Sequence, residues 1–312
     1  MTTRRTMLAG LSASMLIGSA RAQAAVLRVG DQKGGAQSLM KATGALDSMK
    51  AQVQWSQFSA AAPLLEALNA DAIDCGFAGD APTTFALAAG VSARIISPTR
   101  ASGASTAIVV PEGSPIRSVA DLKGRTVGTN RGSVGHSLVL AVIEAQGWAA
   151  SDVKIANLLP SEARAALATG AVDAWSSWGV YVAQARLVDR ARIVVDGRGG
   201  LMTGLSYLVA SDTAIAHKRD ALLDFTARLA TARRWAATHQ DEYAAVLAAD
   251  IGVTAAVAQL IFERDTPMPV PIDEQVMQDQ QKTVDRYVAA GVVRSRLDAR
   301  RIFDASFNAA LG

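Results

Sequence analysis

Short β-branched or apolar runs alternate with helical stretches along the first two thirds of the chain. The first four runs lie at 26–29, 53–57, 72–77 and 94–97. Six more lie at 107–110, 126–129, 154–159, 172–176, 192–195 and 206–210. Strands that alternate with helices are typical of an α/β sheet protein, so we expect this fold class.

The remainder of the chain reads as wholly helical. Its longest helical stretch runs from 222 to 238, and a proline cluster at 267–271 breaks the tail once. We therefore expect a helical tail without further strands.

A weak internal repeat relates two parts of the chain. Segments 63–74 and 160–173 both read as a helix, a turn and a buried strand. Each copy then runs into a polar or aromatic loop, at 79–82 and at 175–178. Two similar α/β lobes would place these loops opposite each other, which predicts a cleft between lobes. Helix–strand units of this kind also recur by chance in unrelated α/β proteins.

The first 24 residues have the pattern of a secretory leader. Arg4 and Arg5 precede a modestly apolar run at 7–18, and Ala22-Gln23-Ala24 suits a cleavage site. The apolar run is too short to span a bilayer. Segment 3–8 also fits the twin-arginine export pattern, with ordinary secretion as the alternative. We expect 1–24 to be a removed signal peptide and the mature protein to be exported.

Loss of the leader changes the charge of the protein. The full chain has 31 basic and 28 acidic residues, and three of the basic ones lie in the leader, so the mature chain is formally neutral. A neutral chain gives no support for a nucleic-acid or membrane-surface partner. The single cysteine, Cys75, excludes an intramolecular disulfide, so the hydrophobic core alone must hold the fold. The mature length is near the size at which chains divide into two lobes.

Three strand-to-helix turns carry groups suited to an anion, at 29–35, 79–84 and 130–136. In open α/β sheets, ligands lie beyond the carboxyl ends of strands, where helix N-termini offer free N–H groups. The first turn offers Gln32 and Lys33. In the second, Pro82 suits the first helical position, and Asp80, which opposes an anion, is expected to cap its own helix. In the third, Ser133 is the candidate N-cap of a helix extending through 146.

Each turn alone is commonly a plain connection, but three around one cleft would supply several inward donors. Trp175 and Trp178 occupy the facing loop of the second copy, so we place both at the cleft, with a core position as the alternative. An indole there would pack against the apolar tail of a ligand.

Enzyme motifs are absent from the sequence. His136, His217 and His239 lack the spacing of a helical metal pair, and no Cys-x-x-Cys, Gly-x-Ser-x-Gly or phosphate-loop motif occurs. Cys75 lies in an apolar strand and is interpreted as a core residue rather than a nucleophile. We expect no enzymatic activity, no metal and no cofactor.

The residues also carry a resemblance to a known family. In the first part of the chain it rests on 27–30 with 32–34, 64–69 with 72–74, 79–80 and 85–90. Further on it rests on 114–116 with 119–124, 132–133 with His136, 163–166 and 173–175. In order and spacing these segments resemble the aliphatic sulfonate-binding proteins of ABC importers. Taurine, nitrate and thiamine-precursor binders are more distant relatives of that family.

The resemblance implies a periplasmic, monomeric protein with a type II-like periplasmic binding protein fold: two sheets in two lobes around a ligand cleft. One lobe would comprise 25–104 and 207–312 and the other 105–206, with crossovers near Ser105 and Tyr207 and closure by hinge bending. The partners would be a small organosulfur anion and an inner-membrane ABC permease. The implied cleft residues are Gln32, Gly79, Asp80, Ser133, His136, Trp178 and Tyr207, with Lys33, Thr106 and Arg264 as further candidates.

Two departures from the family pattern bear on the ligand. The usual Trp-Asp-Pro-Tyr is here Trp178-Gly179-Val180-Tyr181, which lacks a carboxylate for a ligand amine and disfavours taurine. Thr83 stands where the family tends to carry a second proline. We expect a ligand bulkier or less polar than a short alkanesulfonate. The alternatives are another cargo (nitrate, a thiamine precursor or a sulfone) or a desulfinase-type enzyme with a cleft cysteine, against which the leader and Cys75 both argue.

Overall fold

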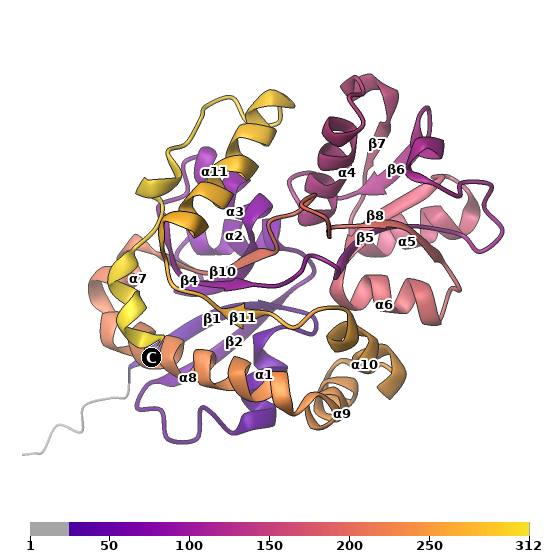
Figure 1. The fold of residues 1–312 in the computed structure, drawn as a ribbon. Coiled ribbons are helices and arrows are strands. Elements are labelled where there is room, and N and C mark those ends of the chain that lie inside the picture. The colour runs from indigo at the N-terminus through magenta and orange to yellow at the C-terminus, as the bar shows by residue number, and fades with distance from the viewer. Residues whose placement is uncertain (1–24, 312) are drawn as a thin grey trace, which may run out of the picture.

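A computed structural model describes residues 25–311, apart from the side chain of Arg264. The signal peptide predicted for 1–24 lies outside the described residues. Figure 1 shows two α/β bodies side by side, each built on one sheet. We call the body around the six-stranded sheet lobe 1 and the body around the five-stranded sheet lobe 2.

Lobe 1 is built on a mixed sheet with the order β11-β4-β10-β3-β1-β2. Its strands are β1 (Val26–Gln32), β2 (Gln52–Phe58), β3 (Cys75–Gly79), β4 (Ala93–Arg100), β10 (Leu205–Ser211) and β11 (Met268–Pro269). The helices of this part of the chain are α1 (Ala36–Thr43), α2 (Ala61–Asn69), α3 (Asp80–Ala88), α7 (Asp212–His217), α8 (Arg219–Thr238), α9 (Gln240–Ile251), α10 (Ala255–Arg264) and α11 (Glu274–Ala289). Short 3₁₀ turns, Ala299–Arg301 and Ala305–Ala310, end it.

Lobe 2 is built on a sheet with the order β7-β6-β8-β5-β9. Its strands are β5 (Thr106–Val110), β6 (Thr126–Thr129), β7 (Lys154–Asn157), β8 (Ala174–Trp178) and β9 (Arg192–Asp196). Its helices are α4 (Val134–Ala145), α5 (Pro160–Thr169) and α6 (Gly179–Leu187), with 3₁₀ turns at Val119–Leu122 and Ala150–Asp152. The predicted fold class, two α/β lobes on two sheets, is confirmed.

All ten predicted strands occur, but some expectations about element positions are wrong. The third strand begins at Cys75 rather than at 72, because Asp71 adopts a positive φ of 50° and the next residues complete a turn. The tail is not wholly helical, since β11 pairs antiparallel with the end of β4. Pro269 is tolerated in β11 because this strand lies at the sheet edge, where a missing N–H breaks no ladder.

The internal repeat has a structural basis in two aspartates. α2 leads into β3 and α5 leads into β8, as predicted. At the turn of the first copy, the Asp74 carboxylate accepts a hydrogen bond from the Arg28 N–H (2.7 Å). At the turn of the second copy, Asp173 accepts one from the Thr126 N–H (2.8 Å). Each aspartate thus ties its turn to the start of the adjacent parallel strand.

Two crossovers connect the lobes, from β4 to β5 and from β9 to β10, and they contact each other. A Cβ on Gly103 (φ 86°) would lie 2.9 Å from the Gly197 carbonyl oxygen. A Cβ on Gly204 (φ 69°) would lie 2.0 Å from the Ala101 carbonyl oxygen. Only glycine permits both this backbone conformation and this approach.

Candidate functional site

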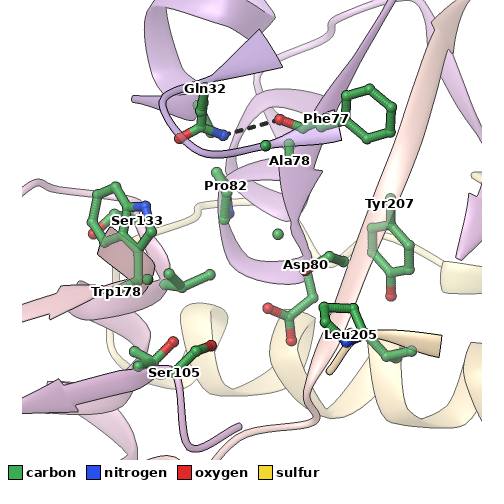
Figure 2. Close-up of a pocket in the computed structure, with 18 of the residues that line it drawn as sticks. Gln32, Phe77, Ala78, Asp80, Pro82, Ser105, Ser133, Trp178, Leu205 and Tyr207 are labelled. Atoms are coloured by element: carbon green, nitrogen blue, oxygen red, sulfur yellow. Dashed lines mark hydrogen bonds between the residues drawn. The ribbon is translucent and has the colours of Figure 1, made fainter. Parts of the chain in front are cut away.

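A cavity of about 510 Å³ lies between the two lobes. It is lined by the ends of β1 and β3, by both crossovers, and by the starts of α4 and α6. Figure 2 shows Trp178 and Ser133 of lobe 2 across from Phe77 and Tyr207 of lobe 1. Its volume lies in the range of small-molecule sites. Eight of the predicted residues line it: Gln32, Lys33, Gly79, Asp80, Thr106, Ser133, Trp178 and Tyr207.

The β1–α1 turn lines the cavity but does not free the amides of α1. The Nε2 of Gln32 donates to the Phe77 carbonyl oxygen (3.0 Å), a contact drawn in Figure 2. The Asp31 carboxylate, which is 1% exposed, accepts from the Gln37 N–H (2.7 Å). Burial raises the pKa of Asp31 to about 6. The expectation that this turn aims backbone donors at an anion is wrong for α1, because a carboxylate already occupies that position.

The β3–α3 turn is organised around Asp80. The helix begins at Asp80, so Pro82 is its third residue rather than its first; it still lies in the first turn, where a missing N–H breaks no bond. The Asp80 carboxylate accepts from its neighbouring Ala81 N–H (2.7 Å), but the N-cap position is held by Gly79, so the prediction that Asp80 caps its own helix is wrong. It also accepts from the hydroxyls of Thr203 (2.5 Å) and Thr283 (2.8 Å). Burial raises its pKa, and these three donors oppose that shift.

The β6–α4 turn is held by Ser133 and His136. The Ser133 hydroxyl accepts from the His136 N–H (3.1 Å), so the predicted N-cap is confirmed. The Nδ1 of His136 accepts from the Gly132 N–H (3.0 Å). His136 is 5% exposed and is not part of the cavity lining. Burial lowers its pKa to about 4, so the ring is neutral near pH 7 and its observed contact is with the loop.

The two tryptophans of β8 lie in different environments. Trp178 lines the cavity, with the ring of Tyr181 edge-on at 5.7 Å between centroids. Trp175 is 1% exposed and packs in the core of lobe 2. Side chains three positions apart on a strand point to opposite faces. The expectation that both face the cleft is therefore wrong for Trp175, which lies in a strand rather than in a loop.

Tyr207 and Thr106 lie on β10 and β5, the strands that follow the two crossovers. Tyr207 is 1% exposed, and its hydroxyl donates to the Oε1 of Gln280 (2.7 Å). Thr106 is 7% exposed, at the start of β5. Arg264 ends α10, and its side chain lies outside the described residues.

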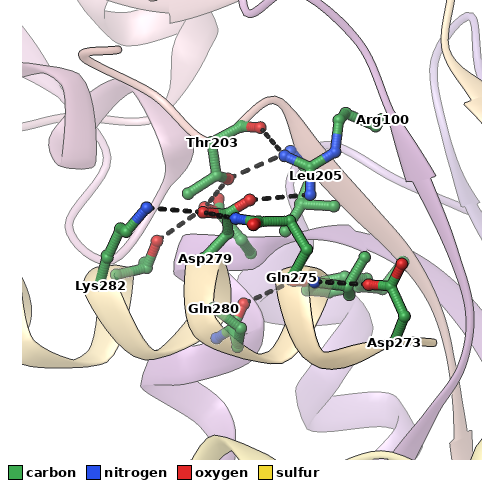
Figure 3. A network of polar contacts seen from close by, with 12 residues as sticks. Arg100, Thr203, Leu205, Asp273, Gln275, Asp279, Gln280 and Lys282 are labelled. Carbon is green, nitrogen blue, oxygen red and sulfur yellow. Dashed lines mark hydrogen bonds and ion pairs between the residues drawn. The ribbon is translucent and has the colours of Figure 1, made fainter. Parts of the chain in front are cut away.

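A polar network joins the second crossover to lobe 1 (Figure 3). Arg100 donates to the Thr203 carbonyl oxygen (3.1 Å) and forms an ion pair with Asp279 (2.8 Å). The Thr203 hydroxyl donates to Asp80. The crossover is therefore bound to both α3 and α11, directly beside the cavity.

Arg233 of α8 and Tyr243 of α9 also line the cavity, and sequence reasoning missed both. They belong to the helical tail, where the periodic pattern shows a buried face but not what that face meets. No local motif marks either residue. Only the packing of α8 and α9 beside the β1–α1 turn brings them to the site.

The described residues contain no cluster of three or more His, Cys, Asp or Glu placed to hold a metal ion. None of the helices in this part of the chain is long and apolar enough to cross a membrane.

Comparisons with known proteins agree with the resemblance seen in the sequence. The profile of a family described as NMT1/THI5-like matches residues 52–243. A putative aliphatic sulfonates-binding protein of Escherichia coli is 33% identical over 300 residues, 94% of this chain and 93% of that protein.

Two solved structures have the same fold. One is the alkanesulfonate-binding protein of Xanthomonas axonopodis pv. citri bound to MOPS, with a TM-score of 0.84 and 31% identity over 90% of this chain and 98% of that one. The other is the periplasmic aliphatic sulphonate binding protein of Escherichia coli, with a TM-score of 0.79 and 31% identity over 89% of this chain and 92% of that one. These likenesses confirm the periplasmic binding protein fold.

Proposed function

The chain belongs to the NMT1/THI5-like family, and we propose that it is a solute-binding protein that captures an organosulfonate-like anion between its lobes for an ABC importer. The observation that carries the proposal is the interlobe cavity, in a chain that is one-third identical to a sulfonate-binding relative over nearly its whole length. The cargo alternatives are nitrate, a thiamine precursor and a sulfone.

Lobe 2 supplies backbone donors for the anionic head. The first amides of a helix have no intrahelical partner and carry a partial positive charge. The N–H groups of Val134, at the start of α4, and Val180, in the first turn of α6, have no partner among the described residues, and both residues line the cavity. Two helix N-termini can thus meet one sulfonate without a formal countercharge.

The rest of the cavity suits an apolar tail. Trp178, Phe85 and Met202 line it, and its volume exceeds the needs of a two-carbon sulfonate. The Xanthomonas relative was solved with MOPS, a sulfonate with a ring in its tail. These features support a ligand bulkier than a short alkanesulfonate. By matching positions, Gln32, Lys33, Gly79, Asp80, Thr106, Ser133, His136, Trp178, Tyr207 and Arg264 remain our candidate ligand-site residues.

We further propose export to the periplasm with loss of the signal peptide, a monomeric state, and delivery to an inner-membrane permease. Segments 25–104 with 207–312 and 105–206 would close on the ligand about the crossovers. A desulfinase-type reaction would need a cysteine in the cleft. Cys75 is fully buried, burial raises the pKa of its thiol, and it does not line the cavity. These features argue against a desulfinase-type reaction and support the proposed binding role.

The test is a thermal-shift and calorimetric screen of the protein without residues 1–24. The ligands are alkane and aromatic sulfonates, taurine, sulfate, nitrate, sulfones and thiamine precursors. A ligand at 100 times its Kd stabilises the bound form by about 2.7 kcal/mol. We expect sulfonates to give the largest shifts and Trp178→Ala to weaken them, with Trp148→Ala, an indole outside the cavity, as the control. Shifts with nitrate or thiamine precursors alone would reassign the cargo.

A further inference from the structure

The cavity has a second polar region, which the sulfonate head does not need. Arg233 of α8, Asp31 at the end of β1 and Tyr243 of α9 line it. The wall around them is apolar and includes Leu229 and Phe262. One positive and one negative side chain are thus present among apolar groups, on the lobe 1 side of the site.

The guanidinium of Arg233 has no hydrogen-bond or ion-pair partner among the residues that the structure describes. Its Nε is buried and has no hydrogen-bond partner. The Nη groups also have no partner among the residues that the structure describes, but they are not among the buried unpartnered atoms. Arg233 is one of the residues that line the cavity. A guanidinium carries five N–H donors in one plane, and leaving them unmade in a low-dielectric site is costly.

Asp31 does not satisfy this guanidinium. The structure contains no ion pair between them, although each charge acts on the other through space. One Asp31 oxygen accepts from the Gln37 N–H, and the other is buried without a partner against Gly35, where a Cβ would lie 2.1 Å away. The Tyr243 hydroxyl already donates to the Gly35 carbonyl oxygen (3.3 Å). Of these three groups, Arg233 is the one with unused hydrogen-bond donors.

We propose that Arg233 binds a carboxylate on the ligand tail, so that the preferred cargo is an organosulfonate with a second negative charge. The inference rests on the proposed function, because the sulfonate head is held at α4 and α6. A carboxylate matches the guanidinium fork with two parallel hydrogen bonds.

The experiment compares matched ligands by calorimetry on the protein without residues 1–24. Each pair differs only in the tail end: propanesulfonate with 3-sulfopropanoate, butanesulfonate with 4-sulfobutanoate, and pentanesulfonate with 5-sulfopentanoate. We expect at least one carboxylated member to bind about tenfold more tightly than its partner. Arg233→Gln should abolish that preference, because it weakens binding of the carboxylated member more than binding of its alkanesulfonate partner. Arg233→Lys, which keeps the charge without the fork, should retain part of it.

Arg117→Gln is the control, since it makes the same change of net charge at an exposed side chain outside the cavity. Two results would overturn the inference and leave sulfonate binding intact: no preference for any carboxylated member in the wild type, or an equal loss for both members of a pair in Arg233→Gln. Absence of binding by every sulfonate would instead remove the proposed function. Melting midpoints establish that each variant is folded. If Arg233→Gln is not folded, Arg233→Lys replaces it: a reduced preference for the carboxylated ligand supports the inference, and an unchanged preference contradicts it.

Discussion

Replacement of Tyr207 by phenylalanine tests whether the Tyr207 hydroxyl supports the cavity wall or contacts the ligand. The Tyr207 hydroxyl donates to the Oε1 of Gln280 (2.7 Å), and the Nε2 of Gln280 donates to the Thr84 hydroxyl (2.5 Å). Tyr207, Gln280 and Thr84 are each 1% exposed or less. Tyr207→Phe therefore leaves the Gln280 oxygen buried without a donor.

The cost follows from that unsatisfied acceptor. Leaving one buried polar group unpaired costs about 1–3 kcal/mol. For a chain of this size, each kcal/mol lowers the melting midpoint by about 2–4 °C. We expect Tyr207→Phe to lower the midpoint by several degrees and to leave ligand affinity within about twofold, because the hydroxyl bonds to α11.

A double-mutant cycle with Gln280→Leu is the assay, read by thermal and urea unfolding. Each single variant orphans one partner, whereas the double variant removes both. The loss in the double variant should therefore be smaller than the sum of the single losses by about 1 kcal/mol or more. Additive losses, or an unchanged midpoint together with a large fall in affinity for Tyr207→Phe, would refute the reasoning and place the hydroxyl on the ligand.

Three further substitutions test the framework around the site. Asp74→Asn should destabilise the protein by about 1–3 kcal/mol at pH 7 in urea titrations, since it orphans partly exposed cations. Burial opposes ionisation of Asp74, but the hydrogen bonds that it accepts lower its pKa below 3.8. The stability that the Asp74 carboxylate contributes is therefore present above pH 3.8 and is lost as the pH falls below it. If Asp74→Asn cost the same stability at pH 7 and at pH 2.5, this reasoning would be contradicted. Gly135→Ala should cost about 1–3 kcal/mol, because its Cβ would lie 2.6 Å from the Ser176 carbonyl oxygen between α4 and β8, whereas Gly113→Ala, with open space around it, should unfold like the wild type. The pKa of Asp31 is raised from 3.8 to about 6, so the free energy of unfolding falls by about 3 kcal/mol as the pH rises through this window. Asp31→Asn should remove that slope, and an unchanged slope in the variant would show that Asp31 does not titrate there.

Local sequence was sufficient for the order of the elements and for the site's framework. Alternating apolar runs located all ten main strands, and the repeat anticipated two helix–strand units. The Ser133 cap was predictable because a cap depends on residues three apart in one turn.

Predictions failed where the partner of a polar or aromatic group lies elsewhere in the chain. Trp175 and Trp178 point to opposite faces of β8, and Trp175 is buried. Predicting this would have required the observed bounds of the strand. The ring of His136 turned toward its own loop rather than into the cavity. The Asp31 carboxylate accepts the hydrogen bond from the Gln37 N–H, a donor that the turn would otherwise have offered to an anion.

The sequence by itself determined the α/β class, the two-lobed repeat, the glycine-rich turns and the family, because these depend on periodicity and on motifs within short segments. The tertiary structure alone decided which side chains meet in the cavity. Arg233 reaches it only because α8 packs beside a turn some two hundred residues earlier in the chain. Whether a buried charge finds a partner is set by such long-range contacts, and periodicity carries no information about them.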